Sequence, residues 1–178
     1  MGERRGSMRI FLRGIAFLVL LGVLGGGVSC APSVPAPDGG MRGSFSAELA
    51  GELYGVSFCA RLEVAEEETG RKIRLEYLSP PALEGMILEN TAGEEGVTLT
   101  LGEQRLETTA AAVAGWLMPA ESLLSVGEEP PLSVERNGEG SYRFVLPGEK
   151  VLTVDPEGIP QSLSSQNVCL SVLRFRGE

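Results

Sequence analysis

The sequence predicts a mainly β (α+β) domain, in which a curled antiparallel sheet forms an unclosed β-barrel and one or two helices cover it. Two observations carry this prediction. Apolar and polar residues alternate with a period of two in about nine short segments after residue 43, and a single alanine-rich stretch interrupts them. Each such strand has one apolar face, so the sheet must curl around that face or lie against a helix to keep it from water.

The first half of this region contains five alternating segments separated by turns. In the first of them, Phe45 and Leu49 share one face with Ala47, while serine and glutamate residues occupy the other. The third segment ends at Ser79–Pro81, because proline donates no hydrogen bond to a sheet. We expect these five strands over residues 44–49, 56–64, 72–77, 86–88 and 97–101.

The period changes in residues 107–124, which predict the one substantial helix. This stretch contains the run Ala110–Ala114, a series of good helix formers, and Thr108 or Thr109 can cap its first turn. Pro119 lacks a backbone N–H, so we expect it to break the helix or to start a second short one.

Alternation returns after the helical stretch and predicts four more strands. Asn137–Gly138 is a strong hairpin signal between the first two of them, and Pro147–Gly148 marks the next turn. The expected strands are residues 132–136, 141–146, 151–154 and 168–175.

The composition excludes several classes of function. The 178-residue chain has 15 Lys and Arg, 24 Asp and Glu and no histidine, which gives a net charge of −9. Without imidazole, Ser-His-Asp, Cys-His and HExxH chemistry are not available. The acidic balance argues against binding nucleic acid, which needs clustered basic residues. We therefore expect no enzymatic activity, no cofactor and no nucleic-acid partner.

The N-terminal residues have the layout of a secretory signal peptide. Residues 1–13 contain four arginines, and residues 14–28 carry no charge. This uncharged stretch of 15 residues is shorter than the roughly 20 that a helix needs to cross a membrane. We expect a signal peptide over residues 1–29, and its removal would take four arginines and one glutamate and leave a net charge of −12.

The residues that follow the signal peptide suggest a lipid anchor. Val28–Ser29–Cys30 resembles the bacterial lipobox, in which small residues precede a cysteine that is acylated on sulfur. The resemblance implies that Cys30 is lipidated, as with palmitate, and holds the protein on the extracytoplasmic side of a bacterial membrane. Cleavage by an ordinary signal peptidase and an uncleaved anchor are the alternatives. Residues 30–43 are rich in proline and glycine and predict a tether, with the folded domain over residues 44–178.

The domain as a whole resembles the LolA/LolB-like lipoprotein-carrier superfamily. The features that carry the resemblance are the corner at Ser79–Gly85 after the third strand, one helical stretch in the middle of the chain, and the turn at Val154–Pro160. The resemblance implies an unclosed barrel whose hydrophobic cavity takes acyl chains, so the expected partner is a hydrophobic ligand or another lipoprotein. A non-enzymatic envelope interaction or sensor module, which contacts a protein partner, is the alternative. A monomer is expected.

One set of apolar side chains is the candidate binding site. On the strands it would form the lining of the barrel, and on the helix it would lie over the mouth. Such residues can also simply fill a core, and sequence leaves the choice between cavity and core open. The candidate residues are Phe45, Phe58, Leu75, Tyr77 and Phe144 on strands, and Trp116, Leu117 and Met118 on the helix.

Two cysteines remain once Cys30 is assigned to the anchor. Cys59 and Cys169 lie in predicted strands of an exported domain, where disulfides persist. If the second and last strands were neighbours, the two cysteines could form a disulfide, and otherwise they are isolated thiols. A metal site is disfavoured, because two cysteines without histidine would need carboxylate ligands.

Overall fold

The computed structural model describes residues 34–37, 41–68, 70–91, 94–126 and 130–177. The predicted lipid-anchor residue Cys30 and the signal peptide lie outside these residues. Val34–Glu178 forms one compact unit. Within its described residues there are one α-helix, one short 3₁₀ turn and eleven strands, so the mainly β fold is confirmed. None of the described helices is long and apolar enough to span a membrane.

The strands are short to moderate in length and follow one another closely along the chain. The elements are β1 Phe45–Leu53, β2 Val56–Glu67, β3 Gly70–Ser79, β4 Met86–Thr91, β5 Gly96–Leu101, β6 Gln104–Thr109, α2 Ala110–Leu124, β7 Ser133–Arg136, β8 Tyr142–Leu146, η1 Pro147–Glu149, β9 Lys150–Val154, β10 Pro160–Ser164 and β11 Val168–Gly177.

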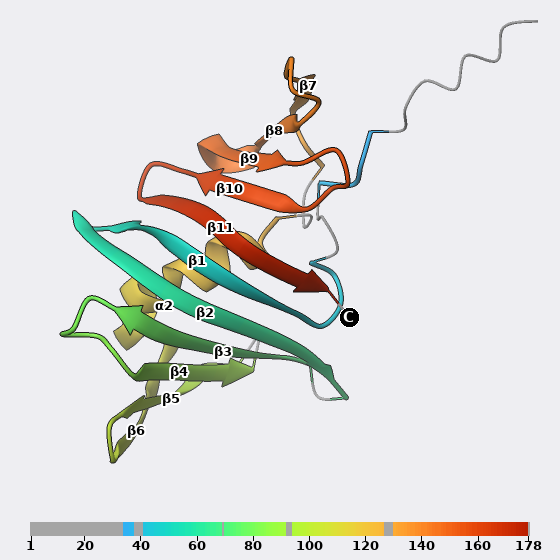
Figure 1. Ribbon diagram of the computed structural model, residues 1–178. Coiled ribbons are helices and arrows are strands. Elements are labelled where there is room, and N and C mark those ends of the chain that lie inside the picture. The colour runs from blue at the N-terminus through green and yellow to red at the C-terminus, as the bar shows by residue number, and fades with distance from the viewer. Residues whose placement is uncertain (1–33, 38–40, 69, 92–93, 127–129, 178) are drawn as a thin grey trace, which may run out of the picture. The chain divides into compact units, whose positions relative to one another are not determined.

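All eleven strands belong to one antiparallel sheet that does not close into a barrel. Its order is β6-β5-β4-β3-β2-β1-β11-β10-β9-β8-β7, so the first and last strands pair in the middle, and β6 and β7 are the two edges (Figure 1). Helix α2 connects these two edges and lies against one face of the sheet. We call this face, which carries Leu75 and Tyr77, the inner face.

Alternation along each strand separates a buried inner face from an accessible outer face. In β1, Phe45, Ala47 and Leu49 are buried, and the residues between them are half-buried. The same period holds in β3 and β8. The largest fully buried side chains form one core with α2, namely Tyr77, Phe144, Leu49, Leu62, Leu75, Leu88, Leu117, Leu123, Leu152, Leu163, Leu170 and Val97.

Helix α2 is a single helix, so the prediction that Pro119 breaks it is wrong. Thr109 caps the first turn, where its hydroxyl accepts a hydrogen bond from the Ala112 N–H at 3.4 Å. A proline within a helix removes one backbone hydrogen bond, and its ring crowds the carbonyl of the residue four positions earlier, which here is Gly115. Because Pro119 and Ala120 are buried against the sheet, packing outweighs this cost.

The chain is closely packed where β1 pairs with β11. A β-bulge lies between Glu48 and Leu49 in this pair. At Gly51, an added Cβ would lie 2.2 Å from the Cys169 carbonyl oxygen. At the end of β1, Tyr54 and Gly55 both have positive φ, 52° and 79°, which makes the tight turn into β2.

The structure differs from the sequence prediction in four respects. Strands β6 and β10 were not predicted, and the helix begins at Ala110 rather than near Glu107. The packed domain also reaches further back than Ser44. Met41, placed in the tether by sequence, is only 2% exposed and belongs to the core, and its carbonyl accepts a hydrogen bond from the Arg71 guanidinium at 2.7 Å.

Candidate functional site

The predicted lining residues come together on the inner face. Phe45, Phe58 and Phe144 are each at most 3% exposed, and Leu75 and Tyr77 expose no surface. They come from β1, β2, β8 and β3, four strands that are distributed across the sheet. The alternation therefore placed these side chains on the correct face.

The three candidate residues on α2 have different surroundings. Leu117 points into the core and is 2% exposed, whereas Trp116 is 36% exposed on the flank of the helix. Met118 is half-buried against the core. Leu117 is thus a packing residue in this structure, and Trp116 is the one of the three with a large accessible surface.

A hydrogen bond holds the middle of α2 to strand β3. The Tyr77 hydroxyl donates to the Trp116 carbonyl oxygen at 2.7 Å, and the two rings meet edge to face with centroids 6.0 Å apart. Phe58 also packs against Tyr77, with ring centroids 5.6 Å apart. Burial raises the pKa of the Tyr77 phenol well above its ordinary value, so the hydroxyl stays a neutral hydrogen-bond donor.

One end of the sheet carries exposed apolar side chains. The β1–β2 and β5–β6 turns and the β3–β4 corner all lie at this end, as the antiparallel registers require. Tyr54 at the β1–β2 turn lies beside the middle of α2, because an added Cβ on Gly115 would lie 3.2 Å from its ring. We call the following four residues the apolar rim: Tyr54, Val56, Leu101 and Trp116, which are 70%, 45%, 45% and 36% exposed.

The space between α2 and the inner face is filled by side chains at the residues that sequence proposed as a lining. Leu75, Tyr77 and Leu117 have almost no surface that a water molecule can reach, and interiors packed to this degree leave little room for a guest. A ligand at these residues would have to displace α2, and the Tyr77–Trp116 hydrogen bond is one of the contacts that it would break.

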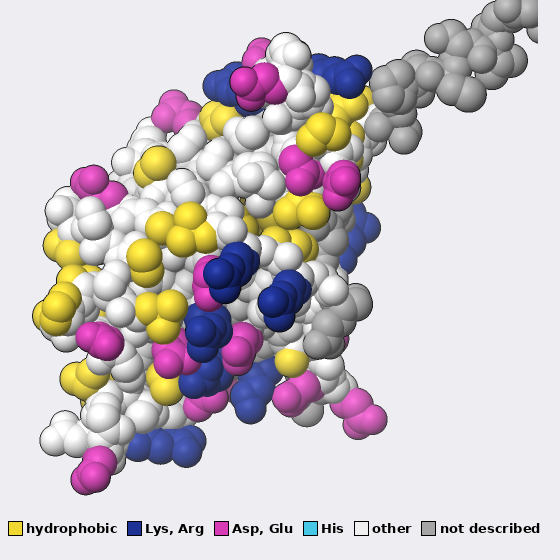
Figure 2. Space-filling model, in the orientation of Figure 1, with side chains coloured by type: hydrophobic (Ala, Val, Ile, Leu, Met, Phe, Trp, Pro, Cys, Tyr) yellow, Lys and Arg dark blue, Asp and Glu magenta, His cyan; other side chains and the backbone are white. Residues whose placement is uncertain are grey.

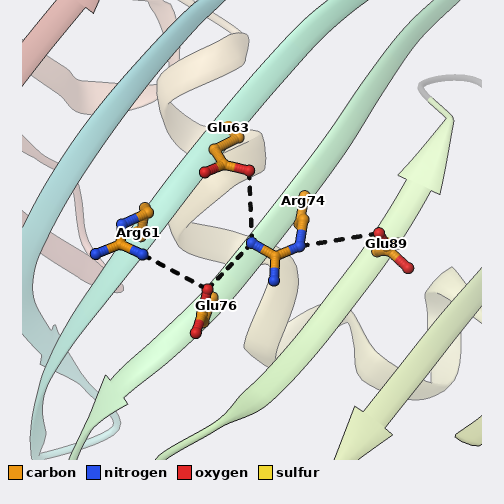
Figure 3. Close-up of polar contacts among 5 residues, drawn as sticks. All are labelled: Arg61, Glu63, Arg74, Glu76 and Glu89. Carbon is orange, nitrogen blue, oxygen red and sulfur yellow. Dashed lines mark hydrogen bonds and ion pairs between the residues drawn. The ribbon is translucent and has the colours of Figure 1, made fainter.

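The outer face carries a network of ion pairs that sequence reasoning missed. Arg74 on β3 lies 3.4 Å from a Glu63 oxygen, 3.1 Å from Glu76 and 3.9 Å from Glu89, and Arg61 lies 3.8 Å from Glu76 (Figure 3). Figure 2 shows basic and acidic side chains gathered near the middle of the face in view. Cross-strand neighbours of opposite charge stabilise a sheet. The network could therefore have been predicted from the opposite charges on the polar faces of adjacent predicted strands.

A hollow of about 710 Å³ adjoins this network, with Lys72, Arg74, Glu89 and Arg176 among its lining residues. A second hollow of about 360 Å³ is lined by Arg61, Arg174 and Arg176 together with carboxylates. Because acidic and basic groups are mixed in both hollows, neither presents a surface of one sign to a charged ligand. We assign this face to the stability of the sheet.

The predicted disulfide is not formed in the structure, where Cys59 and Cys169 are free thiols. The disulfide required the second and last strands to be neighbours. They are not, since β1 lies between β2 and β11. Adjacent strands are about 4.8 Å apart, so two strand spacings exceed the Cα separation of about 7 Å that a disulfide can bridge. Among the described residues, no three acidic, cysteine or histidine side chains are grouped as metal ligands.

Comparison with known proteins finds likeness in structure only. No family model matches the sequence, and no curated protein matches it either. An uncharacterised conserved protein of Thermus thermophilus is similar, with a TM-score of 0.51, 16% sequence identity, and coverage of 78% of this chain and 81% of that one. This likeness extends to the fold alone.

Two further solved structures match with lower TM-scores. A domain from Vibrio parahaemolyticus, described as an outer membrane lipoprotein-sorting protein domain, has a TM-score of 0.43 and 14% identity, and the match covers 75% of this chain and 85% of that one. A LolA superfamily protein from Nitrosomonas europaea has a TM-score of 0.36 and 10% identity, with coverage of 82% and 94%.

Proposed function

We propose that this protein is a non-catalytic binding protein that takes a hydrophobic ligand, or the acyl chain of another lipoprotein, between α2 and the inner face of the sheet. The observation that carries the proposal is that α2 lies across a largely apolar face and is held at its middle by the Tyr77–Trp116 hydrogen bond. A helix held in this way can separate from the sheet while the strands keep their hydrogen bonds to one another.

The first half of α2 is the part that can move most easily. Ala111, Ala112 and Ala114 are exposed, so these positions contribute little to the core, whereas Leu117 to Leu123 provide most of the helix's buried contacts. An apolar molecule arriving at the sheet end would first meet Tyr54 and Trp116 of the apolar rim, and the inner face would become accessible when the helix lifts.

A lipid anchor completes the proposal. We place the protein on the extracytoplasmic side of a bacterial membrane, attached through acyl chains on Cys30 after removal of residues 1–29. The acidic body of the mature chain would not itself dock on anionic lipid. Cys30→Ala is expected to leave an unprocessed precursor that incorporates no labelled fatty acid, which metabolic labelling measures. A wild-type protein that takes up no fatty acid and is recovered in the soluble fraction would contradict the anchor.

Binding can be followed through Trp116, the one tryptophan of the chain. A fluorescent fatty-acid probe is expected to bind and to shift the Trp116 emission. Tyr77→Phe removes one hydrogen bond, a loss of about 1 kcal/mol, and should shift the equilibrium toward the lifted helix. The probe should therefore bind about five-fold more tightly to this variant.

Tyr142→Phe on β8 is the matched control, because Tyr142 is also buried but stacks on Phe144, with ring centroids 6.5 Å apart, rather than on α2. Its affinity for the probe should equal that of the wild type. Absence of probe binding in the wild type and in Tyr77→Phe would contradict the proposal.

The filled interior favours one alternative, an envelope interaction or sensor module that contacts a protein through the same fold. Native mass spectrometry after gentle extraction separates the two functions. A co-purifying lipid supports the binding protein, and an empty domain in complex with another protein supports the interaction module.

A further inference from the structure

Strand β6 is an edge of the sheet, and among the described residues no strand pairs with its outward backbone groups. The two-residue turn Gly102–Glu103 pairs Leu101 with Gln104, and residues that flank such a turn exchange both backbone hydrogen bonds. By alternation, Leu106 also directs its N–H and C=O toward β5. Arg105 and Glu107 therefore direct theirs away from the sheet.

Five of the six residues of β6 are exposed, and they lie on both faces of the sheet. On the outer face, the Arg105 guanidinium lies 3.4 Å from a Glu107 carboxylate oxygen, and the two side chains are 67% and 69% exposed. On the inner face, Leu106 lies opposite Leu99 and is 57% exposed. Figure 2 shows basic and acidic side chains together at the lower left of the molecule, where Figure 1 places β5 and β6.

We propose that β6 pairs with β6 of a second copy of this chain, antiparallel and around a two-fold axis at Leu106. In this register Arg105 lies opposite Glu107 of the second copy, and Glu107 opposite its Arg105. Arg105 and Glu107 would also exchange the interchain backbone hydrogen bonds, because their N–H and C=O groups point outward. The same register therefore pairs the opposite charges and satisfies the backbone groups.

The proposed pairing is complementary in charge and in hydrophobicity. Oppositely charged side chains that face each other across strands attract, and like charges repel. Leu106 would lie directly opposite its own copy in a pair without hydrogen bonds, where side chains come closest. The pairing would cover an exposed apolar side chain and remove an open sheet edge. It would replace the monomer expected from the sequence.

The other edge, β7, offers a poorer fit. It has four residues, and a two-fold pairing centred on Val134 would place Glu135 opposite Ser133 and Arg136 opposite Leu132, without any pair of opposite charges. Pairing of β6 with β7 of another copy would be heterologous and would produce open chains rather than a closed dimer. The complementarity of β6 with itself therefore selects the β6 edge.

Charge reversal tests the register in the full chain, purified in detergent. Arg105→Glu places two carboxylates opposite each other across the axis, and Glu107→Arg places two guanidinium groups there. Both single variants are expected to sediment as monomers at a concentration where the wild type is a dimer. An equimolar mixture of the two should regain the dimer, because each acidic pair then faces a basic pair.

Cross-linking tests the axis position independently. With Cys59 and Cys169 replaced by serine, Leu106→Cys should form a covalent dimer under mild oxidation, since facing residues of such a pair lie within reach of a disulfide. Val134→Cys in the same background is the matched control on the other edge and should give no dimer above the level of the parent chain.

Three outcomes would overturn the pairing. They are a wild-type chain that stays monomeric in sedimentation and gives no Leu106→Cys dimer, a mixture of the charge variants that remains monomeric, and cross-linking through Val134→Cys in place of Leu106→Cys. None of these readouts depends on a ligand, so the result stands apart from that of the probe-binding experiment.

Discussion

Gly51→Ala is expected to destabilise the domain by about 3 kcal/mol or more, in the range of severe overpacking. The added methyl group would lie 2.2 Å from the Cys169 carbonyl oxygen, a backbone atom that cannot rotate away. Relief requires β1 and β11 to separate in the middle of the sheet. Since domains of this size are stable by only about 5–15 kcal/mol, the midpoint of thermal unfolding, measured by circular dichroism, should fall substantially.

Gly96→Ala provides the control for this substitution. Gly96 is the first residue of another strand of the sheet, β5, and an added Cβ there has no neighbour within 4 Å. Its thermal midpoint should stay close to that of the wild type. Equal stability of the Gly51 and Gly96 variants would mean that β1 and β11 are further apart than described.

Leu117→Glu is expected to unfold the domain or to reduce its stability by several kcal/mol. Leu117 is 2% exposed between α2 and the sheet, and a carboxylate placed there would lose its hydration without gaining a partner. Ala114→Glu, one turn earlier on the exposed side of the same helix, should have little effect. Chemical denaturation followed by Trp116 fluorescence measures both variants.

This substitution also bears on how the domain would bind its ligand. A Leu117→Glu chain that folds normally and loses only probe affinity would mean that α2 is lifted from the sheet in solution. A chain that melts, together with a wild type that binds no probe, would favour the interaction module over the binding protein.

Most of the sheet could be predicted from the sequence, because in each long strand the alternation of apolar and polar residues matches the alternation of buried and accessible positions. Positions 56–64 and 72–77 alternate strictly, and these segments became the core of β2 and β3. The one mid-chain helix was also predicted, since a run of five residues such as Ala110–Ala114 has no period of two.

The two unpredicted strands, β6 and β10, lack this alternation. β10 begins with Pro160, and Leu163 is its one buried large apolar side chain. β6 has Leu106 as its one large apolar residue, and the side chain is exposed. Both segments are extended because their neighbours supply hydrogen bonds, a contribution that comes from residues distant in sequence or across a turn. Period alone therefore cannot identify them.

The candidate site, like the sheet, could be predicted only in part. Alternation placed Phe45, Phe58 and Phe144 on the inner face, but the degree to which the interior is filled depends on how close α2 lies. The hydrogen bond from Tyr77 ends on a backbone carbonyl of α2, and every residue offers such an acceptor. The contact therefore has no signature in sequence.

Pairing of the first strand with the last at the centre of the sheet has a consequence for biogenesis. A chain that emerges from its N-terminus exposes one side of β1 until β11, the ten residues from Val168 to Gly177, has also emerged. The two halves of the sheet can form separately as hairpins, but they join only at the end of synthesis or export. Contacts of such long sequence separation slow folding, so the chain would spend this interval with an unpaired central strand, an edge at which chains can aggregate.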